Sequence, residues 1–110
     1  MSHNDNKNEQ LPQTFIRQCS CGYYHLHYRY IMLTIPMHTL FGIMDECYTW
    51  EKMRSHESGM HCRNPFRLVV GVASLAILPE DFEEFNEAVQ QAAYKALNIM
   101  QLIQQTGSQQ

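Results

Sequence analysis

Hydrophobic and polar residues alternate along two short stretches of the chain. After each stretch, the hydrophobic residues recur at the spacing of an α-helix. In the first stretch, aromatic or aliphatic residues occupy the even positions from Tyr24 to Tyr30, with His25, His27 and Arg29 between them. A period of two is typical of a half-buried strand. The pattern predicts that the tyrosines face the core and that the histidines face solvent.

A change in the alternation marks the end of this strand. Beyond Tyr30 the apolar residues move to the odd positions, from Ile31 to Ile35. A shift by one residue exchanges the two faces of a strand, so a turn or a bulge is expected here. The second stretch has Gly71 at the corresponding place, and glycine suits a tight turn. Arg29 stands at the matching position in the first stretch.

Two helices are predicted, one after each pair of strands. The first begins near Pro36 and runs to about Arg54, and the second begins at Pro79, since proline is favoured in a first helical turn. Each helix carries one apolar stripe at helical spacing. The stripes are Leu40, Ile43, Met44, Cys47 and Trp50 in the first helix, and Phe82, Phe85, Val89, Ala92, Ala96, Ile99 and Ile103 in the second.

The two halves of the chain share this order of elements at an offset of 42 residues, with Leu68 falling on Leu26 and Ile77 on Ile35. Pseudo-repeats at about 24–54 and 66–103 therefore predict an α+β fold. In this fold, two ββα units form a four-stranded antiparallel sheet, and both helices pack on one face of it.

The length of 110 residues fits a single domain, which we place at residues 14–104. The polar stretches 1–13 and 105–110 are predicted to be disordered tails. The N-terminal stretch lacks an apolar signal segment. We therefore expect a cytoplasmic protein, in which cysteines stay reduced.

Charge and hydropathy narrow the classes of partner. The formal net charge is -3, from 8 Lys and Arg against 11 Asp and Glu, whereas a nucleic-acid-binding protein normally presents a basic face. No apolar run approaches the roughly 20 residues needed to span a bilayer. We therefore expect neither a nucleic acid nor a membrane as the partner.

Candidate chemistry gathers in the sequence CSCGYYHLHYRY, residues 19–30. Cys19 and Cys21 lie on the same side of an extended chain, and zinc prefers thiolate and imidazole ligands. The sequence therefore leaves two alternatives for a cofactor, namely none or a zinc ion. The predicted ligands are Cys19, Cys21, His25 and Cys62, with His61 or His27 as substitutes.

Two other interpretations of the cysteine pair stay open. Cys19 and Cys21 could be reduced cysteines that pack the entrance of the first strand, because cysteine behaves as a small hydrophobic residue. The pair could also carry thiol chemistry, because a disulfide across one intervening residue is strained and readily reduced. Histidines on the solvent face of a strand need no special role.

The leading functional hypothesis is a small non-catalytic module that binds or regulates through protein contacts. The sequence has no Gly-rich phosphate loop, G-x-S-x-G or H-E-x-x-H motif, which argues against an enzyme. Leu97, Met100 and Ile103 extend past the predicted sheet and are the expected interface of a homodimer. The alternative is a zinc-binding or thiol-redox protein centred on Cys19 and Cys21.

Overall fold

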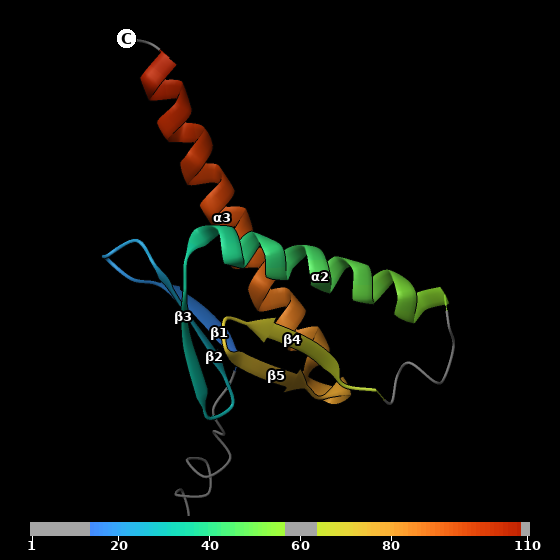
Figure 1. The fold of residues 1–110 in the computed structure, drawn as a ribbon. Helices are drawn as coiled ribbons and strands as arrows, with labels where there is room; N and C mark the ends of the chain where they lie inside the picture. The colour runs from blue at the N-terminus through green and yellow to red at the C-terminus, as the bar shows by residue number, and fades with distance from the viewer. Residues whose placement is uncertain (1–13, 57–63, 109–110) are drawn as a thin grey trace, which may run out of the picture.

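The computed structural model describes residues 14–56 and 64–108 and shows an α+β fold (Figure 1). The predicted α+β class is therefore confirmed. The elements in chain order are the strands β1 (Phe15–Gln18), β2 (Tyr24–Tyr28) and β3 (Ile31–Ile35), the helix α2 (Met37–His56), the strands β4 (Phe66–Val70) and β5 (Ala73–Ile77), the 3-10 turn η2 (Pro79–Asp81) and the helix α3 (Phe82–Ser108).

The described strands form two antiparallel sheets, so the prediction of one four-stranded sheet was wrong. The first sheet has the order β1-β2-β3, and the second consists of β4 and β5. The sequence pattern did not reveal β1, whose four residues are too few to show an alternation. β1 pairs with β2 from Phe15 opposite His27 to Gln18 opposite Tyr24. Because β1 and β3 occupy both edges of β2, the central strand has no free edge for the second hairpin.

Two-residue turns close the two predicted hairpins. Arg29 and Tyr30 join β2 to β3, and Gly71 and Val72 join β4 to β5. The backbone φ is 55° at Arg29 and 64° at Gly71, so the arginine adopts the left-handed conformation that glycine adopts at no cost. Tyr30 is 78% exposed as a turn residue, and the prediction that it faces the core was wrong.

One hydrophobic core connects both sheets and both helices. α2 packs against α3 and β4, and α3 packs against β1. The ring of Phe66 lies 5.3 Å from that of Phe82 and 5.5 Å from that of Trp50, measured between centroids. Burying one such side chain contributes about 1.5–3 kcal/mol relative to leaving it exposed. The largest fully buried side chains are Phe82, Phe85, Leu26, Ile35, Leu40, Leu68, Ile77, Val89 and Cys47.

A polar cluster ties the β2–β3 turn to the start of α3. The Tyr28 hydroxyl donates to Asp81 Oδ2 over 2.9 Å and accepts the Leu78 N–H over 3.0 Å. Arg29 Nε donates to the same carboxylate oxygen over 2.8 Å. The Arg29 guanidinium, and after it the Tyr28 hydroxyl, hold the pKa of Asp81 below its usual value. The cluster therefore holds Arg29 in its strained conformation and joins the first sheet to η2.

Helix α3 is longer than the apolar stripe predicted. It runs to Ser108, and Figure 1 shows its last turns extending away from the two sheets. The stripe is buried at Phe85, Val89 and Ala96, whereas Leu97 is 41% exposed and Ile99 is 42% exposed. In the described ranges, no helix combines the length and the apolar character needed to cross a membrane.

Candidate thiol site in the β1–β2 turn

Residues 19–23 form a tight turn between β1 and β2, which places the cysteine pair at the tip of a hairpin. The Cys19 N–H donates to the Tyr23 carbonyl over 2.7 Å, and the Gly22 N–H donates to the Cys19 carbonyl over 3.0 Å. Gly22 has a φ of 96°, a conformation that side-chain-bearing residues rarely adopt. The backbone hydrogen bonds and this glycine fold the turn so that Cys19 and Cys21 meet.

Cys19 Sγ accepts two hydrogen bonds from Cys21. The Cys21 S–H donates to it with the sulfur atoms 2.7 Å apart, and the Cys21 N–H donates to it over 3.3 Å. Both residues are free thiols, with Cys21 exposed and Cys19 half-buried. Because both donors point at one sulfur, the arrangement stabilises negative charge on Cys19.

His25 adds a third stabilising group from β2. Its ring lies on the outer face of the first sheet, with Arg17 of β1 and Thr34 of β3 as cross-strand neighbours, and its Nδ1 lies 3.2 Å from Thr34 Oγ1. The Cys21 side chain first, then the Cys21 N–H and then His25 lower the pKa of Cys19 from 9.0 to about 7. About half of the Cys19 side chains are therefore thiolate at neutral pH, and the thiolate is the nucleophilic form.

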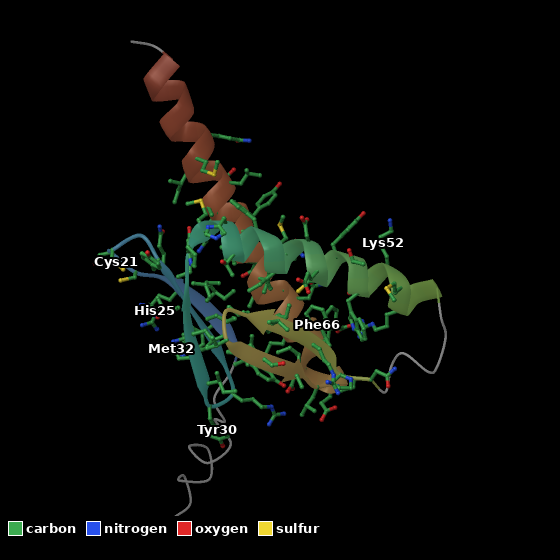
Figure 2. The ribbon with its side chains drawn as sticks, in the orientation of Figure 1. Cys21, His25, Tyr30, Met32, Lys52 and Phe66 are labelled. Atoms are coloured by element: carbon green, nitrogen blue, oxygen red, sulfur yellow. The ribbon has the colours of Figure 1, made fainter. Side chains whose placement is uncertain are left out.

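His27, the other histidine of β2 considered as a zinc ligand, contacts an aromatic ring of β1. His27 stacks on Phe15 with ring centroids 4.2 Å apart and an interplanar angle of 12°. The guanidinium of Arg17 lies 5.4 Å from the centroid of the same phenyl ring. Figure 2 shows Cys21, His25 and Met32 projecting from one side of the first sheet, away from the second sheet.

Part of the predicted zinc site lies outside the described residues, namely Cys62 and its substitute His61. In the described part of the chain, no group of three or more His, Cys, Asp or Glu side chains could hold a metal ion. Phe66, the first residue of β4, lies beside α2, whereas Cys21 lies at the far end of the first sheet (Figure 2). Zinc bound by Cys19, Cys21 and a ligand from residues 61–62 stays a prediction.

The spacing of the two sulfur atoms distinguishes zinc chemistry from thiol chemistry. Two thiolates bound to one tetrahedral zinc at 2.3 Å would lie about 3.8 Å apart. The sulfur atoms of Cys19 and Cys21 are 2.7 Å apart, so they would have to move apart by about 1.1 Å to chelate zinc. The present geometry places the two thiols in direct contact with each other.

The burial and the thiol pKa of Cys47 contrast with those of Cys19. It lies in the apolar stripe of α2 with no exposed surface, which confirms its prediction as a core residue. Burial, and after it the charges of Glu46 and Glu51, raise the pKa of Cys47 to about 12. At neutral pH this thiol is protonated and inaccessible, whereas Cys21 is exposed and Cys19 is half-buried.

The sequence pattern missed the groups that surround the cysteine pair. Without β1, nothing placed Arg17 and Thr34 beside His25 on a common sheet face. A usable signal was present in Gly22, because a glycine just after closely spaced cysteines, between two apolar stretches, is typical of a hairpin turn.

The chain matches no protein-family model, no curated protein and no solved structure. Its function therefore has to be argued from the chemistry of its own residues.

Proposed function

We propose that this protein carries out thiol–disulfide exchange, with Cys19 as the attacking thiolate and Cys21 as the resolving thiol. The single observation that carries the proposal is the 2.7 Å contact in which Cys21 donates to Cys19 Sγ. That contact stabilises the thiolate of one cysteine and keeps the second thiol next to the sulfur that it must later attack. The exposure of Cys21 leaves the pair open to a substrate.

The exchange needs a disulfide substrate, R–S–S–R′. The Cys19 thiolate attacks one sulfur of the substrate, a Cys19–S–S–R bond forms, and R′–S⁻ leaves. Cys21 then loses its proton to water or to the leaving thiolate and attacks the Cys19 sulfur. The bond between Cys19 and R breaks, R–S⁻ leaves, and a Cys19–Cys21 disulfide remains. Two electrons pass from the dithiol to the substrate, and the reverse sequence would oxidise a dithiol partner.

The turn supplies strain that makes the product disulfide easy to reduce. Only one residue, Ser20, separates the cysteines, and short bridges depart from the geometry that unstrained disulfides adopt. Strained or exposed disulfides have the more oxidising potentials and act as labile or catalytic bonds. These properties favour an exchange role over a structural cross-link.

Mass spectrometry after incubation in glutathione redox buffers tests the proposal. We expect wild type to form an intramolecular Cys19–Cys21 disulfide, whereas Cys21→Ser stops at a glutathione adduct on Cys19. Cys19→Ser should form neither species at the wild-type rate. Ser20→Ala serves as the matched control, because no hydrogen bond of this side chain supports the site. Free thiols at both positions in fully oxidised glutathione would refute the exchange role.

The exposed end of α3 favours a second function, namely binding to another protein chain. We propose that α3 pairs with α3 of a second copy of this chain, through a surface that includes Leu97 and Met100. Leu97 is 41% exposed, Met100 is half-buried, and the side chain of Ile103, also predicted in this interface, lies outside the described part. Lys95 is the one charged residue from 88 to 108, so two antiparallel copies meet without clustered like charges.

Sedimentation over a range of protein concentrations tests this pairing. Leu97→Glu places a charge in the proposed interface and should shift a dimer to monomer. Asn98→Glu adds the same charge at the neighbouring exposed position and is the matched control. A monomeric wild type at high concentration, or equal weakening by both variants, would refute the proposed interface.

A further inference from the structure

A groove runs along the free edge of β1, next to the cysteine turn in the chain. It has a volume of about 320 Å³ and is lined by residues 15–18 of β1, by Tyr24 of β2 and by Ala92 and Lys95 of α3. β1 is an edge strand, and α3 packs against it. The lining residue Gln18 directly precedes Cys19 in the chain, so the groove lies next to the cysteine turn.

Two cationic side chains line this groove without a carboxylate partner in the described structure. Arg17 and Lys95 are both exposed. The ion pairs of the described residues join Arg29 to Asp81 and Arg54 to Glu51, so neither lining cation takes part in them. The sequence from residue 14 to residue 44 contains no Asp or Glu at all.

The nearest acidic side chains belong to a neighbouring hollow. Glu84 and Glu87 line that second hollow and do not line the β1 edge groove, whereas Lys95 lines both hollows. Glu87 is eight residues before Lys95, which corresponds to about 12 Å along a helix. Arg17 comes from the opposite wall of the groove. Arg17 is therefore the lining cation that does not share a hollow with these carboxylates.

We infer that the β1 edge groove binds the carboxylates of a small anionic disulfide and presents its sulfur atoms to Cys19. This inference rests on the proposed exchange function and names its class of substrate. Arg17 and Lys95 would hold the carboxylates, and the apolar wall from Phe15 and Ala92 would cover the carbon chain. Arg17 precedes Cys19 by two residues, about 7 Å along a strand, so one small molecule can reach both residues.

The size of the groove favours a small molecule over a folded protein partner. Ligand pockets for small molecules have volumes of roughly 300–1,000 Å³, and this groove lies at the lower limit. It therefore accommodates one half of a small disulfide, while the other half leaves as a thiolate. Attraction of an anion by a cation about 7 Å away in water raises its local concentration about threefold. Two such cations acting independently give roughly tenfold.

The test compares three disulfides that differ in charge. Reduced full-length protein is mixed at low ionic strength with dithiodiglycolate, which is anionic, with 2-hydroxyethyl disulfide, which is neutral, and with cystamine, which is cationic. The rate of Cys19–Cys21 oxidation is divided by the rate for a capped peptide of residues 19–23, which corrects for intrinsic reactivity. Arg17→Gln and Lys95→Gln remove the lining charges one at a time. Arg67→Gln removes an exposed charge from β4 and is the matched control.

We expect the corrected rate of wild type to be about tenfold higher with the anionic than with the neutral disulfide, and lowest with the cationic one. Arg17→Gln and Lys95→Gln should each lower the ratio of the anionic to the neutral corrected rate about threefold. Arg67→Gln should leave this ratio unchanged. High salt should abolish the preference in wild type, because exposed charges are screened. Equal corrected rates for all three disulfides, or a preference unchanged by Arg17→Gln and Lys95→Gln, would overturn the inference and leave the exchange function intact. Failure of every disulfide to oxidise the pair would instead overturn both.

Discussion

Replacing Cys21 by alanine tests the origin of the reactivity of Cys19. The change removes the side-chain hydrogen bond that contributes most to the lowered pKa, and it leaves the backbone N–H of residue 21 and His25 in place. We therefore expect the pKa of Cys19 to rise from about 7 toward its ordinary value of 9.0. The alanine side chain is small and the position is exposed, so the hairpin itself should persist.

The size of the effect follows from two opposing terms. If the pKa returned fully to 9.0, the thiolate fraction at pH 7 would fall from about one half to about one hundredth, roughly 50-fold. A more basic thiolate is also a better nucleophile, by about eightfold for this change in pKa at a Brønsted coefficient near 0.45. In that limit, wild-type Cys19 should react about sixfold faster at pH 7. Near pH 10, where both thiols are largely ionised, the variant should be faster by about sevenfold, and the profiles should cross near pH 8.

The assay follows the loss of the Cys19 thiol during reaction with 2-hydroxyethyl disulfide from pH 5 to pH 10, with the site identified by fragmentation mass spectrometry. Ser20→Ala should reproduce the wild-type profile. A crossing of the two curves is the diagnostic result, because a simple loss of structure would change accessibility in the same direction at every pH. Parallel profiles for wild type and Cys21→Ala would refute the assigned cause of the lowered pKa.

Three further predictions concern the polar cluster that joins the first sheet to η2. Tyr28→Phe leaves the Leu78 N–H without its acceptor, so it should lower the free energy of unfolding by about 1–2 kcal/mol in urea titrations. Tyr48→Phe, at an exposed site, is the control and should change this free energy by less than about 0.5 kcal/mol. Arg29→Gly should be more stable than Arg29→Ala by about 1 kcal/mol, because both lose the ion pair and only glycine fits a φ of 55° without strain; equal stabilities would contradict this. Because the pKa of Asp81 is lower in the folded state, its ionised form stabilises the fold above the unfolded-state pKa, and this contribution is lost as pH falls through the folded-state pKa. Asp81→Asn should therefore make the free energy of unfolding depend less on pH below about pH 4.

The sequence predicted the elements with strong periodicity and failed where the decisive contacts are distant along the chain. The inward residues of β2 and the buried stripe of α2 follow from spacing alone, and both were predicted. The division into two sheets depends on β1, whose four residues show no clear alternation. The conformation of Arg29 is stabilised by Asp81, which lies 52 residues away. No local pattern around residue 29 contains that information.

The candidate site shows the same division between local and distant causes. The proximity of Cys19 to Cys21 is local, and the sequence therefore identified the pair. Its surroundings come from His25 across the hairpin and from α3, which lies about 75 residues further along the chain. The distance between the two sulfur atoms, on which the proposed thiol chemistry rests, is also not provided by any spacing in the sequence.

A last prediction separates the geometry of the turn from the stability of the fold. Gly22 and Gly71 both have positive φ values, 96° and 64°, and an added Cβ would meet no atom within 4 Å at either position. Alanine at either site should therefore cost about 1 kcal/mol or more through backbone strain alone. Gly22→Ala should in addition move Cys21 away from Cys19 and raise the pKa of Cys19, whereas Gly71→Ala should leave that pKa near 7. Unfolding titrations give the first quantity, and the pH dependence of Cys19 reactivity gives the second. If both variants lost stability and neither changed the reactivity of Cys19, the turn would not be what activates the thiol.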